Sequence, residues 1–138
     1  MTFYVLDTNI ISLLLRGDPV VTARFRSSLI PENLVIACPL VWYEIRRGLL
    51  KRDARRQTSH FEELFQTFIW QDYTIADWTL ATELWAIRQT QGLPIADADL
   101  LIAVFARKRS AILATNNESD FQALGVRIEN WTKPVENK

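Results

Sequence analysis

Four acidic residues stand where their side chains could share one chemical task. Asp7 follows a short apolar run near the N-terminus, Glu44 lies within a helical pattern, and Asp97 and Asp99 begin a nearly all-apolar segment. A helix with an apolar body holds its polar first turn at the edge of the core, so we expect Asp97 and Asp99 to lie near a cleft. Glu44 lies at the edge of the apolar face of its own helix, which also places it beside the core.

Carboxylates that converge on one site need protons or a cation. Two unit charges about 4 Å apart repel by about 4 kcal/mol at an effective dielectric of 20. Magnesium prefers carboxylate, water and phosphate oxygens, whereas zinc is disfavoured because His60 and Cys38 are the only histidine and cysteine of the chain. A hard cation held in this way can activate water and stabilise a phosphodiester under in-line attack.

Each acid also has a structural explanation that involves no chemistry. Asp97 is a suitable N-cap, and Asp99 suits the positive end of the helix dipole, although the Leu-Leu-Ile that follows Asp99 is less easily explained by capping. Glu44 can pair with an arginine on its own helix. Asn117 and Asp120 are spaced as a capping box.

Short strands and helices alternate along the whole predicted chain. Strands are predicted at residues 3–6, 34–38, 73–75, 111–114 and 126–128, and helices at residues 9–16, 20–29, 40–51, 54–70, 78–91 and 98–109. This alternation favours an α/β fold with a central, mainly parallel sheet flanked by helices. Ligands of such folds bind outside the carboxyl ends of the strands, where the strand order reverses. If the first and fourth strands flank that point, Asp7 faces Thr115, Asn116 and Asn117.

Composition is consistent with one soluble domain. The chain has 138 residues, of which 49% are apolar and 23% are charged, and its formal net charge is zero. Net charge therefore indicates no class of partner, and a single cysteine allows no internal disulfide. The apolar run before Asp7 is too short for a signal peptide or a membrane span, so we expect a cytoplasmic protein. We expect residues 1–131 to form the domain and residues 132–138 to form a flexible tail.

Gly48 is unusual within the predicted helix at residues 40–51. Glycine in a helix interior costs about 1 kcal/mol relative to alanine, which predicts a close approach of another part of the chain at this position.

Several motifs in the same order resemble the PIN-domain nuclease family. They are Leu6-Asp-Thr-Asn9, the helix acid Glu44, the segment from Pro94 to Ala103, and Ala114-Thr-Asn-Asn117 followed by Asp120. The resemblance is closest to the VapC toxins of bacterial toxin–antitoxin pairs, and it covers essentially the whole chain.

The resemblance implies a Mg²⁺- or Mn²⁺-dependent endoribonuclease that hydrolyses RNA through a metal-activated water. It also implies a PIN-like fold, a homodimer, and inhibition by a small VapB-type antitoxin. Asp7, Glu44 and Asp99 match the catalytic acids of the family, and Asp7 and Asp99 are the pair expected to contact the metal directly. Accessory or second-metal roles are expected for Thr8, Asp97, Asn116, Asn117 and Asp120.

The role of the basic residues is open, and two other classes of function are considered. A cluster of basic residues either contacts RNA or the antitoxin or forms the solvated face of two helices; its members are Arg46, Arg47, Lys51, Arg52, Arg55 and Arg56. The main alternative is a non-catalytic PIN-fold module that binds RNA or a partner. A phosphohydrolase with Asp7 as nucleophile is disfavoured because Asn9 stands where haloacid-dehalogenase-like enzymes have a second acid.

Overall fold

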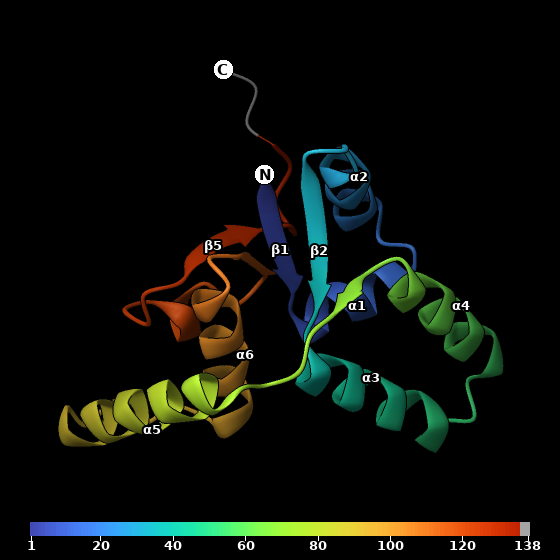
Figure 1. The fold of residues 1–138 in the computed structure, drawn as a ribbon. Coiled ribbons are helices and arrows are strands. Elements are labelled where there is room, and N and C mark those ends of the chain that lie inside the picture. Colours follow the sequence, from blue (N-terminus) through green and yellow to red (C-terminus); the bar gives the residue numbers. More distant parts are fainter. Residues whose placement is uncertain (136–138) are drawn as a thin grey trace.

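A five-stranded parallel sheet forms the centre of the structure, a computed structural model that describes residues 1–135 (Figure 1). In spatial order the strands are β3 (Ile69–Trp70), β2 (Asn33–Ala37), β1 (Thr2–Leu6), β4 (Ile112–Thr115) and β5 (Arg127–Asn130). The first strand lies in the middle and pairs with β2 on one side and β4 on the other. The strand order therefore reverses between β1 and β4, which confirms the predicted position of the switch point.

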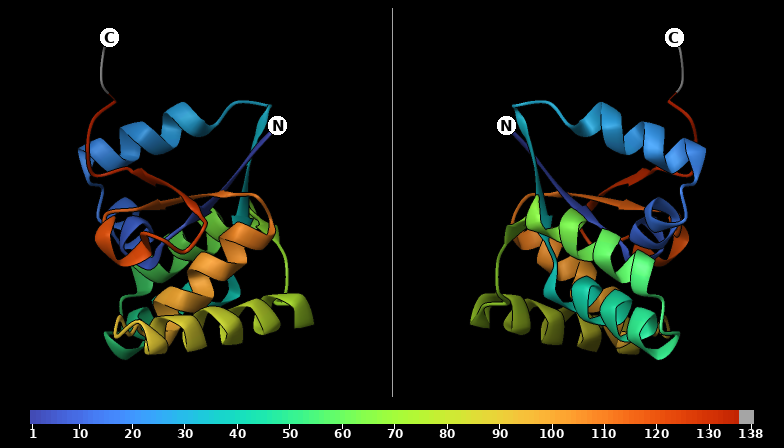
Figure 2. Two further views of the ribbon diagram at one scale, coloured as in Figure 1. Left: turned by 90° about the vertical axis from the view of Figure 1, so that its left-hand side faces the viewer. Right: turned by 90° about the vertical axis from the view of Figure 1, so that its right-hand side faces the viewer.

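Helices cover both sides of the sheet and one of its ends. They are α1 (Thr8–Leu15), α2 (Pro19–Ser28), α3 (Pro39–Lys51), α4 (Arg55–Gln66), α5 (Ile75–Thr90) and α6 (Asp97–Lys108), with a 3₁₀ turn at Ser119–Phe121. Figure 2 shows α1 and α2 on one side of the sheet and α5 and α6 on the other. The nearly all-apolar α6 is buried along most of its length, as its sequence predicts.

The third strand is shifted from its predicted place. The sequence pattern predicts a helix to residue 70 and a strand at residues 73–75, but α4 ends at Gln66 and the strand is Ile69–Trp70. Residues 74 and 77 form a capping box in which each side chain accepts a hydrogen bond from the other's backbone N–H, so α5 begins where the strand was predicted. This local cap outweighs the short apolar run that suggested a strand.

An ion pair buried between α5 and α6 links these two helices. Arg109 donates to both carboxylate oxygens of Asp77, at 3.0 and 2.9 Å, and its guanidinium lies 3.6 Å from the ring centroid of Phe105. The side chain of Asp77 is fully buried. This pair fixes the N-terminal end of α5 against the C-terminal end of α6.

Two predictions about single residues have different outcomes. Cys38 is buried and unpaired, as expected, and its Sγ lies 3.4 Å from the hydroxyl of Tyr73. The close approach predicted at Gly48 is wrong, because a Cβ atom added there would meet nothing within 4 Å. This glycine borders open space instead.

The ends of the chain bear on two further expectations. Thr132 donates to Asn130, and Lys133 forms an ion pair with Glu118 at 3.0 Å. Residues 136–138 of the expected tail lie outside the described residues, so the tail stays a prediction. Within residues 1–135, no helix has the length and apolar character needed to cross a membrane.

Candidate active site

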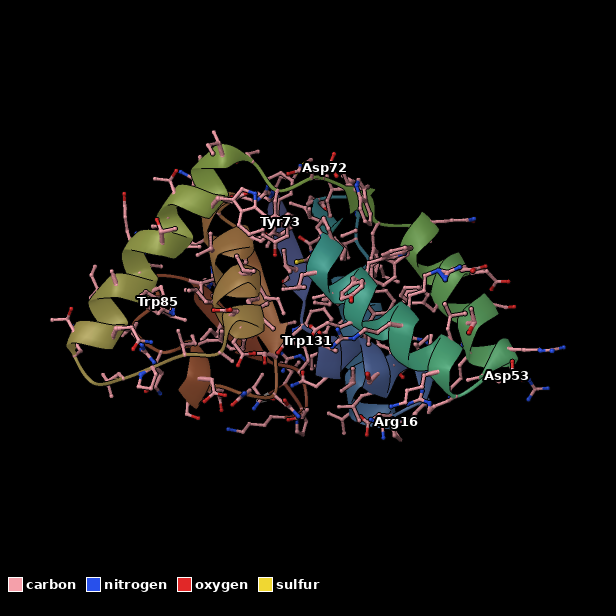
Figure 3. All side chains as sticks on the ribbon, turned by 90° about the horizontal axis from the view of Figure 1, so that it is seen from below. Arg16, Asp53, Asp72, Tyr73, Trp85 and Trp131 are labelled. Carbon is pink, nitrogen blue, oxygen red and sulfur yellow. The ribbon has the colours of Figure 1, made fainter. Side chains whose placement is uncertain are left out.

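A cavity of about 360 Å³ opens at the carboxyl ends of β1 and β4. Its lining includes Asp7 from the end of β1, Glu44 from the middle of α3 and Asp99 from the first turn of α6. Figure 3 views the molecule from the side on which β1 and β2 end. The structure therefore brings together the three acids that were predicted to be catalytic.

Asp7 is the most buried of the three, with 5% of its surface exposed. One carboxylate oxygen accepts from the backbone N–H of Thr8 at 2.8 Å, and the other accepts from the hydroxyl of Thr115 at 2.7 Å. Burial raises the pKa of Asp7, the two hydrogen bonds lower it, and the nearby charges of Asp99 and Glu44 raise it further, with a net increase. The site thus holds a desolvated carboxylate that a cation would stabilise.

Thr8 connects two of the three acids. Its backbone N–H donates to Asp7, and its hydroxyl donates to Oε1 of Glu44 at 2.9 Å. Asp7 also caps α1, and Thr8 is the first residue of this helix. The cap therefore holds Thr8 in one position. Thr8 therefore sets the position of Glu44 relative to Asp7.

Asp99 faces the cavity, but Asp97 does not. Ala96 is the N-cap of α6 and makes no side-chain cap, so the prediction that Asp97 caps this helix is wrong. Asp97 is exposed and borders a separate hollow beside Trp85. Burial raises the pKa of Asp99, and the charges of Asp120 and Glu44 raise it further.

Amides occupy the region where a fourth acid was expected. The side-chain amide of Asn9 donates to Oδ1 of Asn116, while Oδ1 of Asn9 is buried and has no hydrogen-bond partner in the described structure. The predicted capping box is wrong, because the backbone N–H of Asn117 donates to Thr115 and only its side-chain amide reaches Asp120. Of the expected accessory residues, Thr8 and Asn117 line the cavity, whereas Asn116 and Asp120 lie outside its lining.

The donor atoms of the cavity fit a hard cation that retains several water ligands. No group of three or more His, Cys, Asp or Glu side chains that could hold a metal ion occurs within residues 1–135. Magnesium needs no such group, since it is commonly bound through one or two carboxylates, with water and phosphate completing its octahedron. The unpaired Oδ1 of Asn9 is a further oxygen at the same cavity.

Sequence reasoning missed several residues of this site, and one pattern could have identified some of them. Ser12 and Arg16 were missed; they follow the predicted Thr8 at intervals of four, in the middle of α1 and at its C-cap, so the three residues share one face of the helix. Thr115 was expected to face Asp7 across the first and fourth strands, and the pairing of β4 with β1 confirms this expectation.

Basic residues predicted to contact RNA or an antitoxin lie outside the cavity lining. Arg46 is 3.8 Å from Glu62 and lies over the ring of Trp42, and Arg47 lies over the ring of Tyr43. Lys51 is exposed at the end of α3. Their predicted contacts stay predictions.

Comparisons with known proteins agree along nearly the whole chain. The PIN domain family model matches residues 4–126, which include all three cavity acids. The chain is 30% identical over 132 residues to Ribonuclease VapC1 of Haemophilus influenzae strain R2866, which covers 94% of this chain and 98% of that protein. It is 28% identical over 133 residues to the tRNA(fMet)-specific endonuclease VapC of Shigella flexneri, covering 96% and 100%.

Solved structures show the same fold. VapBC2 from Rickettsia felis, bound to a DNA fragment from its promoter, has a TM-score of 0.85 and 25% identity, with coverage of 94% of this chain and 99% of that one. VapBC-1 from nontypeable Haemophilus influenzae has a TM-score of 0.84 and 26% identity, with coverage of 96% and 100%.

Proposed function

We propose that this chain, which belongs to the PIN domain family, is a metal-dependent endoribonuclease. In this proposal it hydrolyses phosphodiester bonds of RNA and is the toxin of a VapBC-type toxin–antitoxin pair. The observation that carries the proposal is the convergence of Asp7, Glu44 and Asp99 on one cavity at the switch point of the sheet. Relatives named as ribonuclease and endonuclease support the reaction class.

Asp7 and Asp99 are the residues that would hold Mg²⁺, for which Mn²⁺ can substitute. When bound, such a cation activates water for attack on the phosphodiester and stabilises the charge that develops on phosphorus oxygens. Burial raises the pKa of both carboxyls, so their ionised forms would gain from a nearby positive charge, which supports this assignment. Glu44 adds a third negative charge at the same cavity.

Hydrogen bonds fix Asp7 and Glu44 before substrate arrives. Thr8 donates to one oxygen of Asp7 and Thr115 donates to the other. Each oxygen therefore keeps a lone pair that these hydrogen bonds do not use. The hydroxyl of Thr8 also restricts Glu44. Groups held in this way favour the transition state, because no reorganisation is needed at the moment of reaction.

A small antitoxin and a second copy of the chain are the proposed protein partners. The solved structures with the same fold are named VapBC, which supports an antitoxin of VapB type. Apolar side chains are exposed along α5, including Ile75, Trp78 and Trp85, which supports a homodimer.

Expression of this chain in a bacterial host, with growth as the measurement, tests the proposal against the alternative of a non-catalytic binding module. The nuclease reading predicts growth arrest by the wild type and normal growth with Asp7→Asn, at equal protein levels. Asp72→Asn, which changes an exposed carboxylate outside the cavity, should retain the arrest. Equal arrest by wild type and Asp7→Asn would favour a non-catalytic PIN-fold module that binds RNA or a partner.

A further inference from the structure

A second hollow, about 640 Å³ in volume, lies between the end of α1, the second half of α3 and the start of α4. Thr8, Ser12, Arg16 and Glu44 line both this hollow and the carboxylate cavity, so the two are continuous. Figure 3 shows Arg16 and Asp53, which lie at the ends of α1 and α3 that border it. We call this second hollow the basic groove.

Positive charge dominates the lining of the basic groove. Four arginines line it, namely Arg16, Arg52, Arg55 and Arg56, against the single carboxylate of Glu44. Arg16, Arg52 and Arg56 form no ion pair within residues 1–135, and Arg55 pairs only with the exposed Asp53 at 3.4 Å. The groove therefore carries cationic charge that the described protein does not neutralise.

Helix stability does not explain these residues. Arg55 and Arg56 occupy the first turn of α4, where the helix dipole disfavours positive charge, and the N-cap Ala54 provides no side-chain hydrogen bond. Gly48 weakens α3 by about 1 kcal/mol relative to alanine, although an added Cβ would meet nothing within 4 Å. Because Gly48 lines the groove, its missing side chain leaves the groove wider.

We propose that the basic groove binds the sugar–phosphate backbone of the RNA strand that enters the carboxylate cavity, an inference that rests on the proposed function. A strand with one phosphate at the carboxylates must continue beyond the cavity, and the groove is continuous with it. Arg16 lines both hollows and so contacts the phosphate nearest to the cleaved bond, while Arg52 and Arg56 contact phosphates farther along. No aromatic side chain lines the groove, so binding there reads charge and not base identity.

Binding of a fluorescent single-stranded RNA of about 20 nucleotides and mixed sequence tests this inference. Affinity is measured in EDTA, without cleavage, at salt concentrations from about 50 to 200 mM. We expect Arg16→Gln/Arg52→Gln/Arg56→Gln to weaken binding about tenfold or more at the lowest salt. The slope of log affinity against log salt should fall by about 2, since each phosphate contact to a single strand contributes ~0.7.

Two further variants distinguish RNA binding in the groove from a general effect of positive charge on RNA affinity. Arg26→Gln/Lys108→Gln/Arg127→Gln removes the same charge from exposed positions outside the groove and should bind RNA like the wild type. Gly48→Gln keeps the net charge but fills the groove, and it should weaken binding while the helix is strengthened. Urea denaturation confirms that each variant is folded.

Several results would overturn the inference. The inference is wrong if the triple arginine variant and Gly48→Gln both bind RNA as tightly as the wild type. It is also wrong if the control variant loses as much RNA affinity as the triple arginine variant. Unchanged RNA affinity with lost binding of the co-encoded antitoxin would assign the groove to an acidic protein segment. The proposed function fails separately, if the wild type binds RNA through the groove but cleaves none of it in Mg²⁺ or Mn²⁺.

Discussion

Thr8 is the residue through which two of the three acids are positioned, and its hydroxyl can be removed with little change of shape. Thr8→Val deletes the hydrogen bond to Glu44 and keeps the backbone N–H that donates to Asp7. We expect RNA cleavage to fall about 10- to 100-fold, the range found for partners that orient metal-site ligands. Thr8→Ser should restore cleavage, because it restores the hydroxyl.

Melting temperature distinguishes this positioning role from a structural one. A loss of cleavage that is accompanied by unfolding, or that Thr8→Ser fails to rescue, would contradict the assignment of Thr8.

At neutral pH, the buried carboxyl of Asp7 is predicted to lower the free energy of unfolding. Burial first, and then the charges of Asp99 and Glu44, raise its pKa above the usual value of 3.8, so the folded chain holds this proton at pH values where the unfolded chain has lost it. Stability therefore falls as pH rises through that window. Asp7→Asn should raise the free energy of unfolding by about 0.5–2 kcal/mol near neutral pH, without metal.

Urea denaturation at two pH values checks this prediction. The gain from Asp7→Asn should shrink as the pH approaches the usual range of an Asp carboxyl, where the wild type also becomes neutral. The exposed substitution Asp72→Asn should show no such dependence. A gain that grows toward acid pH would refute the sign of the shift.

At the scale of elements, the buried ion pair between α5 and α6 is the contact most sensitive to a single change. Arg109→Ala would leave the carboxylate of Asp77 buried without its partner, and we expect a loss of about 3–5 kcal/mol in unfolding free energy. Arg24→Ala, which removes a more exposed ion pair to Glu129 at 3.5 Å, should cost much less. Similar losses for the two variants in urea denaturation would argue against the special importance of the α5–α6 pair.

Long apolar patterns made most elements predictable, whereas short ones did not. The two central strands and the buried α6 follow from continuous apolar runs, which only a buried element can satisfy. The two-residue β3 carries too little pattern of its own, because its place depends on pairing with Ile36 and Ala37. Ala96, not Asp97, occupies the N-cap position of α6, a choice made by backbone geometry that residue type does not reveal.

At the scale of the whole molecule, the convergence of the three cavity acids was predictable, whereas the shape of the surface around them was not. Asp7, Glu44 and Asp99 each stand at the end or edge of an apolar element, which the sequence shows directly. The basic groove combines the ends of α1, α3 and α4. The charge pattern indicated Arg52, Arg55 and Arg56, but only the folded chain brings Arg16 into the same hollow. The same charge pattern included Arg46 and Arg47, whose side chains lie over neighbouring rings and outside the groove lining.

Metal binding should stabilise the whole fold. A cation that binds the folded chain alone adds about 2.7 kcal/mol at a hundredfold excess over its Kd. We expect Mg²⁺ or Mn²⁺ to raise the melting temperature of the wild type and to have much less effect on Asp99→Asn. The metal concentration required should increase as pH falls, because burial raises the pKa of Asp7 and Asp99 and the cation must displace their protons. Equal shifts in wild type and Asp99→Asn would place the metal elsewhere.

Cleavage of total RNA by the purified protein, freed of any bound antitoxin, tests the central claim most directly. We predict fragments in Mg²⁺ or Mn²⁺ that are absent with EDTA and absent with Asp99→Asn, and sequencing of their ends would then identify the target. Wild-type protein that is folded and antitoxin-free, yet as inactive as Asp99→Asn, would contradict the assignment of these carboxylates to a ribonuclease site.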